Sequence, residues 1–335
     1  MQPLLEKLCA GRALSQDESR GLFEGVMRGE CPPATLAALL VALRIKGEHS
    51  DEIAGAAAAM RASALPFPRP DYAFADCCGT GGDGAGTLNV STAVAVVLAA
   101  CGLPVAKHGN RAVSSRAGSA DVLEALGMKL GIAPNNARRM LDETGFCFLF
   151  APQYHAGVRH AMPVRRELAT RTLFNLLGPL SHPAAPPLQL LGVYDAGLCR
   201  TVAMTLRQLG CRTALVVNGG IDEIALHGPT QVAHLHDGEI DTFVIDPRDA
   251  GLEPQPLDAL AGGDAAFNAT VLRRLLGGED NGAFADAVAL NAGAMLWACG
   301  RATNLRDACA FAREAIASGR ALERLEQAVE ISHGE

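Results

Sequence analysis

Three alternating prolines, Pro66, Pro68 and Pro70, divide the chain into two regions of different character. Proline fixes φ and has no amide hydrogen, so this segment is unsuited to the interior of a helix or a sheet. From Leu4 to Ala64 the apolar pattern is helical throughout. Beyond the prolines, short apolar runs alternate with helical ones. We therefore predict a small all-helical N-terminal domain followed by a large α/β domain.

Helix boundaries can be read in the first region. Ser15 and Glu18 have the spacing of a capping box, which marks a helix start. A second helix follows a pair of prolines and is expected to end at Gly47. A third is expected to start at Asp51.

The second region predicts a mainly parallel sheet flanked by helices. Its expected strands cover residues 72–77, 103–106, 146–150, 188–193 and 213–217. A hairpin is expected across Asp237-Gly238, a pair that favours a tight turn. The segment Arg171–Leu177 reads as a helix and is expected to return to the small domain.

Composition narrows the class of protein. The 335 residues include 49% hydrophobic and 19% charged residues, which indicates a globular chain. A net charge of −7 disfavours general binding of nucleic acid. The ten cysteines lie in apolar or helical stretches, so we expect reduced thiols rather than disulfides or zinc sites. The N-terminus has no pattern of a signal peptide or membrane span, and a cytoplasmic location is expected.

A glycine-rich turn at Cys78–Gly84 is the strongest chemical signal. It follows an expected strand and precedes a helix that begins near Asn89-Val90-Ser91-Thr92. Glycine lets the backbone approach an anion closely, and a helix start supplies free N–H groups. The turn fits neither the Walker loop nor the dinucleotide pattern. An ordinary glycine turn is the alternative, but the hydroxyls that follow favour a phosphate site.

Three further segments carry polar chemistry. Residues 107–119 hold cations, amides and hydroxyls at an expected strand end, where α/β sheets bind ligands. Asp222-Glu223 offers oxygen ligands for Mg²⁺ near the expected phosphates. Arg165 and Arg166 could grip a carboxylate through paired hydrogen bonds, although a surface ion pair is the alternative for either.

These motifs together resemble the anthranilate phosphoribosyltransferase family over nearly the whole chain. The matching runs are GTGGD, NVST, KHGNRAVSS, RTLFNLLGPL and the Asp222-Glu223 pair, in the family's order and spacing. The resemblance implies an Mg²⁺-dependent transfer of phosphoribosyl from phosphoribosyl pyrophosphate to anthranilate, in tryptophan biosynthesis. It also implies a homodimer formed through a small helical domain, residues 1–66 joined by a segment near 165–185. Residues 71–164 and 186–335 would form the large domain that binds phosphoribosyl pyrophosphate.

The resemblance also implies site residues. For catalysis they are Lys107, which would neutralise the leaving group, and His108, the possible general base. The metal ligands would be Ser91, Asp222 and Glu223, and the anthranilate contacts Gly79, Asn110, Arg165, Pro152 and Pro179. Phosphoribosyl pyrophosphate would contact Gly79, Gly82, Asp83, Thr87, Asn89, Val90, Ser91, Thr92, Lys107, His108, Gly109, Asn110, Arg111, Ala112, Val113, Ser114, Ser115 and Ser119.

Two departures and two alternatives accompany the resemblance. Many relatives have glycine where this chain has Ala112 and Ala169, which affects backbone detail rather than function. A pyrimidine nucleoside phosphorylase would share the architecture but not the KHGN run. A catalytically silent nucleic-acid-binding paralogue would need basic grooves and would lose the carboxylate pair, whereas this chain is acidic and keeps the pair.

Overall fold

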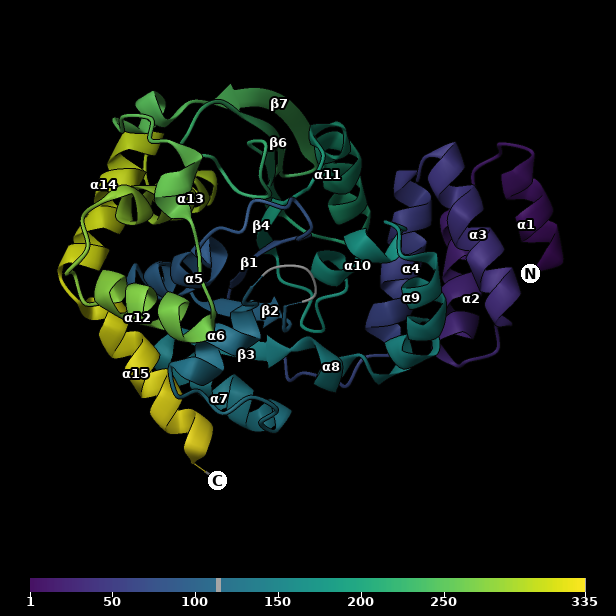
Figure 1. The fold of residues 1–335 in the computed structure, drawn as a ribbon, viewed down its shortest axis with the longest axis horizontal. Coiled ribbons are helices and arrows are strands. Elements are labelled where there is room, and N and C mark those ends of the chain that lie inside the picture. The colour runs from purple at the N-terminus through teal and green to yellow at the C-terminus, as the bar shows by residue number, and fades with distance from the viewer. Residues whose placement is uncertain (113–115, 335) are drawn as a thin grey trace.

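The computed structural model describes residues 1–112 and 116–334. An N-terminal group of helices lies at one end, and an α/β domain built on a seven-stranded sheet lies at the other (Figure 1). This arrangement confirms the predicted fold class. Within the described ranges, no helix is both long and apolar enough to cross a membrane.

The helical end is built from four N-terminal helices. They are α1 (Gln2–Cys9), α2 (Gln16–Met27), α3 (Pro33–Lys46) and α4 (Ser50–Ala62). The predicted capping box is confirmed: the hydroxyl of Ser15 accepts the Glu18 N–H, and the Glu18 carboxylate accepts the Ser15 N–H at 2.8 Å. The expected start at Asp51 is wrong, because α4 begins at Ser50 with His49 as its N-cap.

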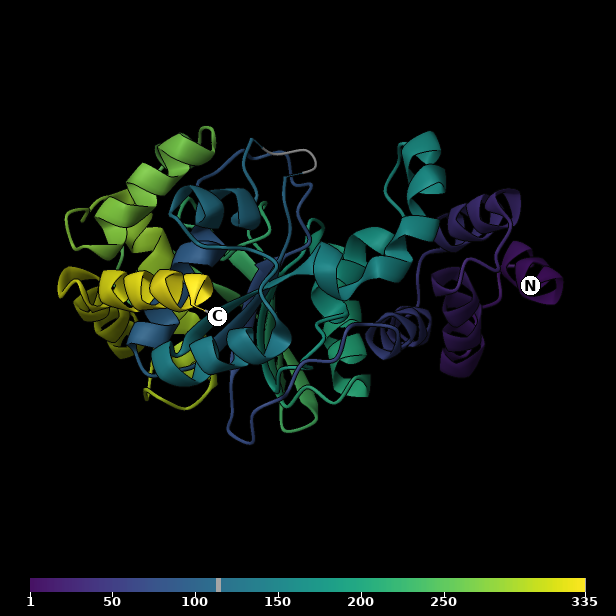
Figure 2. The same cartoon turned by 90° about the horizontal axis from the view of Figure 1, so that it is seen from below.

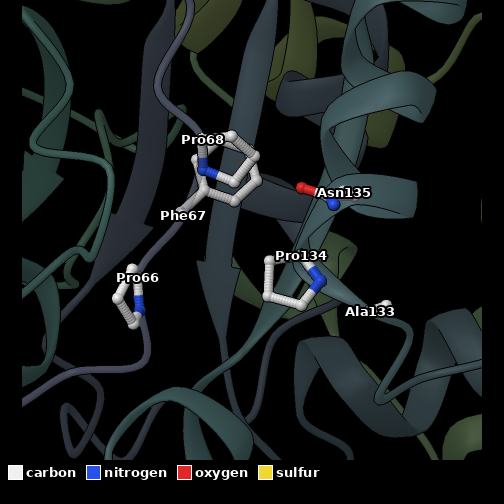
Figure 3. A pocket seen from close by; sticks show the side chains of 6 residues that line it. All are labelled: Pro66, Phe67, Pro68, Ala133, Pro134 and Asn135. Carbon is white, nitrogen blue, oxygen red and sulfur yellow. The ribbon is translucent and has the colours of Figure 1, made fainter.

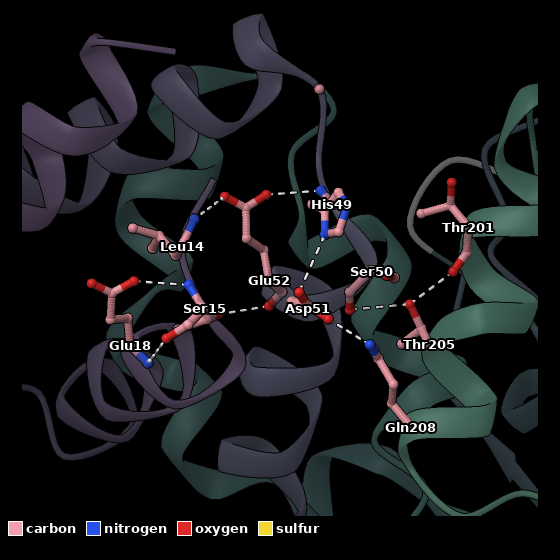
Figure 4. Close-up of polar contacts among 12 residues, drawn as sticks. Leu14, Ser15, Glu18, His49, Ser50, Asp51, Glu52, Thr201, Thr205 and Gln208 are labelled. Atoms are coloured by element: carbon pink, nitrogen blue, oxygen red, sulfur yellow. Dashed lines mark hydrogen bonds and ion pairs between the residues drawn. The ribbon is translucent and has the colours of Figure 1, made fainter. Parts of the chain in front are cut away.

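A buried carboxylate organises this end of the molecule (Figure 4). Glu52 is 0% exposed and accepts the backbone N–H groups of Leu14 at 2.9 Å and His49 at 2.7 Å. Glu52 also forms an ion pair with Lys46, whose Nζ lies 2.8 Å from the Glu52 Oε2. A buried charge is tolerated only when it is paired and hydrogen-bonded in this way. The contacts fix the loop before α2 against the start of α4.

The sheet has the strand order β3-β2-β1-β4-β5-β6-β7. Its strands are β1 (Ala75–Gly79), β2 (Val105–Gly109), β3 (Phe146–Phe150), β4 (Leu188–Gly192), β5 (Thr213–Asn218), β6 (Thr230–His236) and β7 (Glu239–Ile245). The strands β1 to β5 are mutually parallel. Strand β6 runs antiparallel to β5, and β7 runs antiparallel to β6. The predicted hairpin is confirmed, with positive φ at both Asp237 and Gly238.

Two strands differ from the prediction by more than one residue at each end. The first strand starts at Ala75 rather than Tyr72, because the chain leaving the proline linker has not yet reached its neighbours in the sheet. The second strand extends to Gly109, since the residues from Val105 onward pair with β3 along its whole length. Lys107 and His108 are therefore strand residues and not part of a loop.

The two faces of the sheet are covered by different helices. One face packs against α5 (Val90–Ala100) and α13 (Ala283–Ala298), which form a core with Leu190 and Leu215. The other face packs against α10 (Phe174–Leu180) and α11 (Cys199–Gln208). That second core continues into the N-terminal helices, so the helical end is joined to the sheet by shared apolar packing.

The remaining helices complete the layers. They are α6 (Ser119–Ala125), α7 (Pro134–Thr144), α8 (Ala151–Tyr154), α9 (Met162–Leu168), α12 (Ala265–Leu276), α14 (Leu305–Ala317) and α15 (Arg320–His333). Helix α9 packs on α3, and α10 packs on α4 between the two ends of the molecule (Figure 2). The helix expected at Arg171 starts only at Phe174, because the Asn175 amide oxygen caps the Thr172 N–H at 3.0 Å.

The proline linker packs along the α/β domain. Phe67 is buried, and the linker borders a shallow pocket opposite Pro134 at the start of α7 (Figure 3). Arg138 donates a hydrogen bond of 2.9 Å to the carbonyl of Pro68. The linker therefore has a fixed path over the sheet, and it delivers the chain directly into β1.

Candidate active site

The site lies where the strand order reverses. The chain runs outward from β1 to β2 and β3, then returns to place β4 on the other side of β1. Ligands of such sheets bind at this switch point, outside the carboxyl ends of the strands. Here those ends are Gly79 and Gly192, which pair with each other. A Cβ on Gly79 would stand 2.0 Å from the Asp222 Oδ2, so the loop after β5 fits only against glycine.

The predicted phosphate turn and carboxylate pair form one site. The Gly81 N–H donates to the Asp222 carboxylate at 2.7 Å. In return, the Asp83 carboxylate accepts the Asp222 N–H at 3.3 Å. Gly81 and Gly82 both have positive φ, which glycine adopts without strain. The structure thus joins two motifs that are far apart in sequence.

The carboxylates at this site disfavour one another's ionisation. Burial, followed by the nearby charge of Asp83, raises the pKa of Asp222 to about 7. Burial and the charge of Asp222 raise the pKa of Glu223 to about 8. A cation bound beside the pair would lower both pKa values, because it favours the charged form of each carboxylate. In the described part of the chain, no three acidic, histidine or cysteine side chains are grouped to hold a metal ion. Mg²⁺ commonly uses one or two carboxylates plus substrate phosphates, and the pair fits that pattern.

Lys107 and His108 lie on opposite faces of the sheet, because side chains alternate along β2. The buried Lys107 points toward α5, where its Nζ donates to the Cys77 carbonyl at 2.6 Å and to the Ser91 hydroxyl at 3.2 Å. Its charge lowers the pKa of Glu223, against the larger effect of burial. The charge of this buried lysine therefore favours the ionised form of Glu223.

His108 points toward α10 instead. Its Nδ1 lies 3.2 Å from the Gly178 carbonyl oxygen. The rings of His155 and His182 lie 5.1 and 5.4 Å from its own. Burial and these neighbours hold the pKa of His108 well below its ordinary value. The ring is therefore neutral near pH 7, because burial disfavours its charged form.

The start of α5 is held by amide contacts. The Asn89 side chain accepts from the Asn268 amide at 2.9 Å and donates to the Ala117 carbonyl at 3.1 Å. Thr87 forms an isolated bridge with Ala261. The predicted substrate contacts Val90 and Thr92 are both buried, whereas Ser91 is partly exposed. Of these three residues at the start of α5, only Ser91 thus has a partly accessible side chain.

The rest of the predicted phosphate loop extends away from β2. Arg111 is held by α6, with ion pairs of 3.0 Å to Asp121 and 2.8 Å to Glu124. Asp121 also accepts the Ala112 N–H at 2.9 Å. Ser119 donates to the Asn110 carbonyl at 3.4 Å. The predicted contacts Val113, Ser114 and Ser115 lie outside the described residues.

The residues predicted to bind anthranilate come from separate elements. Arg165 is partly buried on α9, with its guanidinium 5.2 Å from the Phe174 ring, and Arg166 is exposed. Burial lowers the pKa of Arg165. Pro152 is exposed on α8, and Pro179 is buried on α10. Among described contacts, those of Arg165 are with Phe174 and Met162, so its guanidinium has no carboxylate partner there.

Two residues near the site were not singled out by the sequence. Arg171 donates to the Gly82 carbonyl, and its guanidinium lies 4.3 Å from the Tyr194 ring. The sequence pattern predicts a helix over Arg171–Leu177, and nothing in that pattern indicates the contact of Arg171 with the glycine-rich turn. Asp76 is fully buried in β1 and accepts the His108 N–H at 3.2 Å. An aspartate inside an apolar strand was the signal for it.

The fold and the site define a two-domain glycosyl transferase. The helical bundle domain of a glycosyl transferase family matches residues 2–64, and the a/b domain of a glycosyl transferase family matches residues 71–322. An anthranilate phosphoribosyltransferase from Sorangium cellulosum is 57% identical over 99% of this chain and 96% of its own. One from Aeromonas salmonicida is 53% identical over 99% and 98%. This chain belongs to the anthranilate phosphoribosyltransferase family.

Solved structures agree with this assignment. The crystal structure of anthranilate phosphoribosyltransferase from Thermus thermophilus superposes with a TM-score of 0.94 at 44% identity, covering 99% of both chains. The enzyme from Saccharomyces cerevisiae in complex with phosphoribosyl pyrophosphate and Mg superposes with a TM-score of 0.91 at 28% identity, covering 100% of this chain and 98% of that one.

Proposed function

We propose that the enzyme transfers the phosphoribosyl group of phosphoribosyl pyrophosphate to the amine of anthranilate. The products are N-(phosphoribosyl)anthranilate and pyrophosphate, and the reaction is the one that the relatives' name describes. We place it in tryptophan biosynthesis. One observation carries the proposal: the glycine-rich turn and the Asp222-Glu223 loop meet at the switch point of the sheet. The expected cytoplasmic location is part of the same proposal.

The proposed substrate site extends along the strand ends. The turn from Gly79 to Asp83 and the start of α5 would surround the pyrophosphate with backbone N–H groups. Residues of the 107–119 segment would contact the remaining phosphate and ribose. Asp222 and Glu223, with Ser91, would hold Mg²⁺. Bound there, Mg²⁺ would neutralise the charge that develops on the departing pyrophosphate.

The chemistry needs no covalent nucleophile. The bond from the anomeric carbon to the pyrophosphate oxygen breaks, and its electron pair leaves with the pyrophosphate. The ribose ring oxygen stabilises the resulting positive charge, and the amine lone pair then forms the C–N bond. The protein contributes electrostatic stabilisation and orientation, to which Lys107 adds a positive charge below the site.

Arg165 and His108 complete the proposed acceptor site. Arg165 would hold the anthranilate carboxylate through two parallel hydrogen bonds. The attacking arylamine needs no base before it reacts, because its lone pair is free. After the C–N bond has formed, the nitrogen carries an extra proton, which the neutral His108 could accept.

We also propose the domain division and the assembly. Residues 1–66, with the segment near 165–185, would form the small domain, and 71–164 with 186–335 the large one. The shared packing of α3 on α9 and α4 on α10 supports this division. The small domain would form a homodimer. Ile45 at the end of α3 is 82% exposed, which supports a contact there.

The test is a fluorescence assay for the loss of anthranilate. With phosphoribosyl pyrophosphate and Mg²⁺ present, anthranilate fluorescence should decay, and addition of EDTA should stop the decay. Parallel incubations with a pyrimidine nucleoside and phosphate should show no cleavage. Nucleoside phosphorolysis without anthranilate turnover would replace the proposal with the phosphorylase alternative.

A further inference from the structure

Asn291 is a buried amide in the middle of the apolar helix α13. The residue is 0% exposed, as are its neighbours Leu290 and Ala292. Asparagine is a weak helix former, and burying an amide is costly unless its polar atoms are hydrogen-bonded. The position therefore requires a specific set of partners for the side chain.

Those partners are supplied mainly by Ile224. The Asn291 Oδ1 accepts the Ile224 N–H at 2.9 Å, and its Nδ2 donates to the Ile224 carbonyl at 2.9 Å. The second amide hydrogen is donated to the Ala287 carbonyl at 2.9 Å. A primary amide carries the same donor and acceptor as a peptide group. Asn291 thus pairs with both backbone groups of Ile224 as an adjacent strand would.

The contact lies directly beside the carboxylate pair. Ile224 follows Glu223, so fixing its N–H fixes the peptide group that joins these two residues. On the next residue, the Ala225 N–H donates to the Thr230 hydroxyl at 2.9 Å. On the other side, Asp222 is confined by the strand ends. The loop is therefore restrained from the sheet and from the helix layer.

The side chain that restrains the Asp222-Glu223 loop is uncharged. The Asp83 carboxylate accepts the Asp222 N–H at 3.3 Å, so two acidic side chains already meet in this loop beside Glu223. A cationic side chain in the place of Asn291 would compete with a bound cation for these carboxylates. The amide of Asn291 fixes the backbone without contributing charge.

We infer that Asn291 is a positioning residue that holds Glu223 where a divalent cation and the pyrophosphate of the substrate bind. The inference rests on the proposed function and adds to it a residue from the opposite layer of the domain. It predicts that loss of the amide weakens metal binding by more than its effect on stability explains.

The first test compares two changes in the same helix. Asn291→Leu removes all three hydrogen bonds but keeps the branched shape and the number of side-chain heavy atoms, and Leu296→Ala removes a fully buried apolar side chain. Binding of Mn²⁺ in the presence of inorganic pyrophosphate is measured by electron paramagnetic resonance, with thermal unfolding recorded alongside. Asn291→Leu should weaken Mn²⁺ binding by roughly tenfold or more, the usual effect of losing an outer-shell partner. Leu296→Ala should change it by less than about twofold.

Equal Mn²⁺ binding by the wild type and Asn291→Leu would overturn the inference alone, and so would equal weakening by Leu296→Ala. A wild-type protein that binds no Mn²⁺ with pyrophosphate would remove the proposed function itself. The second test needs no variant. In the metal-free wild type, amide hydrogen exchange at Ile224 should be as slow as inside α13. Rapid exchange that slows only when Mg²⁺ and pyrophosphate are added would contradict a preformed restraint.

Discussion

Gly192, at the end of β4, lies so close to Asp222 that a Cβ at Gly192 would stand 1.5 Å from the Asp222 carbonyl oxygen. No side chain can be accommodated there without moving the loop. Gly192→Ala should therefore displace the Asp222-Glu223 pair and lower kcat/KM by roughly a hundredfold, about 3 kcal/mol of misplaced electrostatic stabilisation. Steady-state kinetics at saturating Mg²⁺ would measure the loss.

Gly228→Ala is the matched control for that change. Gly228 has open space where its Cβ would lie, and it is part of the same loop between β5 and β6. Its activity should stay within about twofold of wild type. A Gly192→Ala enzyme that is as active as Gly228→Ala would show that the Asp222 loop tolerates movement.

Removal of the carboxylates should abolish turnover without unfolding the protein. Asp222→Asn with Glu223→Gln keeps the shape of both side chains but removes their charge, at an estimated cost of about 4 kcal/mol, or roughly a thousandfold in rate. Circular dichroism should remain that of the wild type. The double change Glu239→Gln with Asp241→Asn, on the β6-β7 hairpin, should leave the rate unchanged. Full activity of the first variant in Mg²⁺ would remove the metal assignment.

The two adjacent arginines of α9 should behave differently. Neighbouring side chains on a helix point about 100° apart, and Arg165 is the partly buried one. Arg165→Ala should remove roughly 2–4 kcal/mol of charge-assisted binding and so raise the KM for anthranilate strongly. The KM for phosphoribosyl pyrophosphate should change much less. Arg166→Ala should leave both KM values nearly unchanged. The reverse result would place the acceptor site on the other side of α9.

Stability should fall on mild acidification because of His155. Burial lowers the pKa of this side chain from 6.5 to about 4. Below pH 6.5 the unfolded chain binds a proton that the folded protein does not, so the stabilising contribution is complete above that pH and declines toward pH 4. At pH 5 the loss is about 2 kcal/mol. Urea unfolding of His155→Phe should show a pH dependence smaller by that amount, and that of the exposed His160→Phe should match the wild type.

Assembly should depend on the N-terminal helices. The proposed contact is the small domain, in which α10 buries Leu176 and Leu177 within the protomer while α1 to α4 carry the exposed Ile45. Sedimentation at micromolar concentration should show a dimer. Ile45→Glu should shift the equilibrium toward monomer, whereas Val244→Glu on β7 should not. A wild-type monomer would contradict the proposed assembly.

Local features could be predicted from the sequence because their determinants are neighbours in the chain. The capping box of Ser15 and Glu18 and the hairpin at Asp237-Gly238 each depend on a few adjacent residues. The two-region architecture followed from the proline linker and from the change in hydrophobic period. The resemblance of whole motifs likewise indicated the family before any contact between them was known.

Backbone conformation was harder to predict from the sequence than these local features. Ala169 ends α9 with φ of 44°, a left-handed conformation that glycine adopts more easily. The absence of glycine there hid the helix end from sequence reasoning. In the same way, the polar character of Lys107 and His108 suggested a loop, although pairing with β3 makes them strand residues on opposite faces. Pairing between strands outweighed local composition in that case.

Only the tertiary structure decided which distant residues meet. Asp83 and Asp222 are 139 positions apart, and Asn291 and Ile224 are 67 apart. Hydrophobic periodicity specifies which face of an element is buried, but it carries no information on which neighbour that face meets. The packing of the whole sheet and its two helix layers sets those pairings. The residue types that form the site could thus be predicted from the sequence, whereas their arrangement in space was decided by the fold.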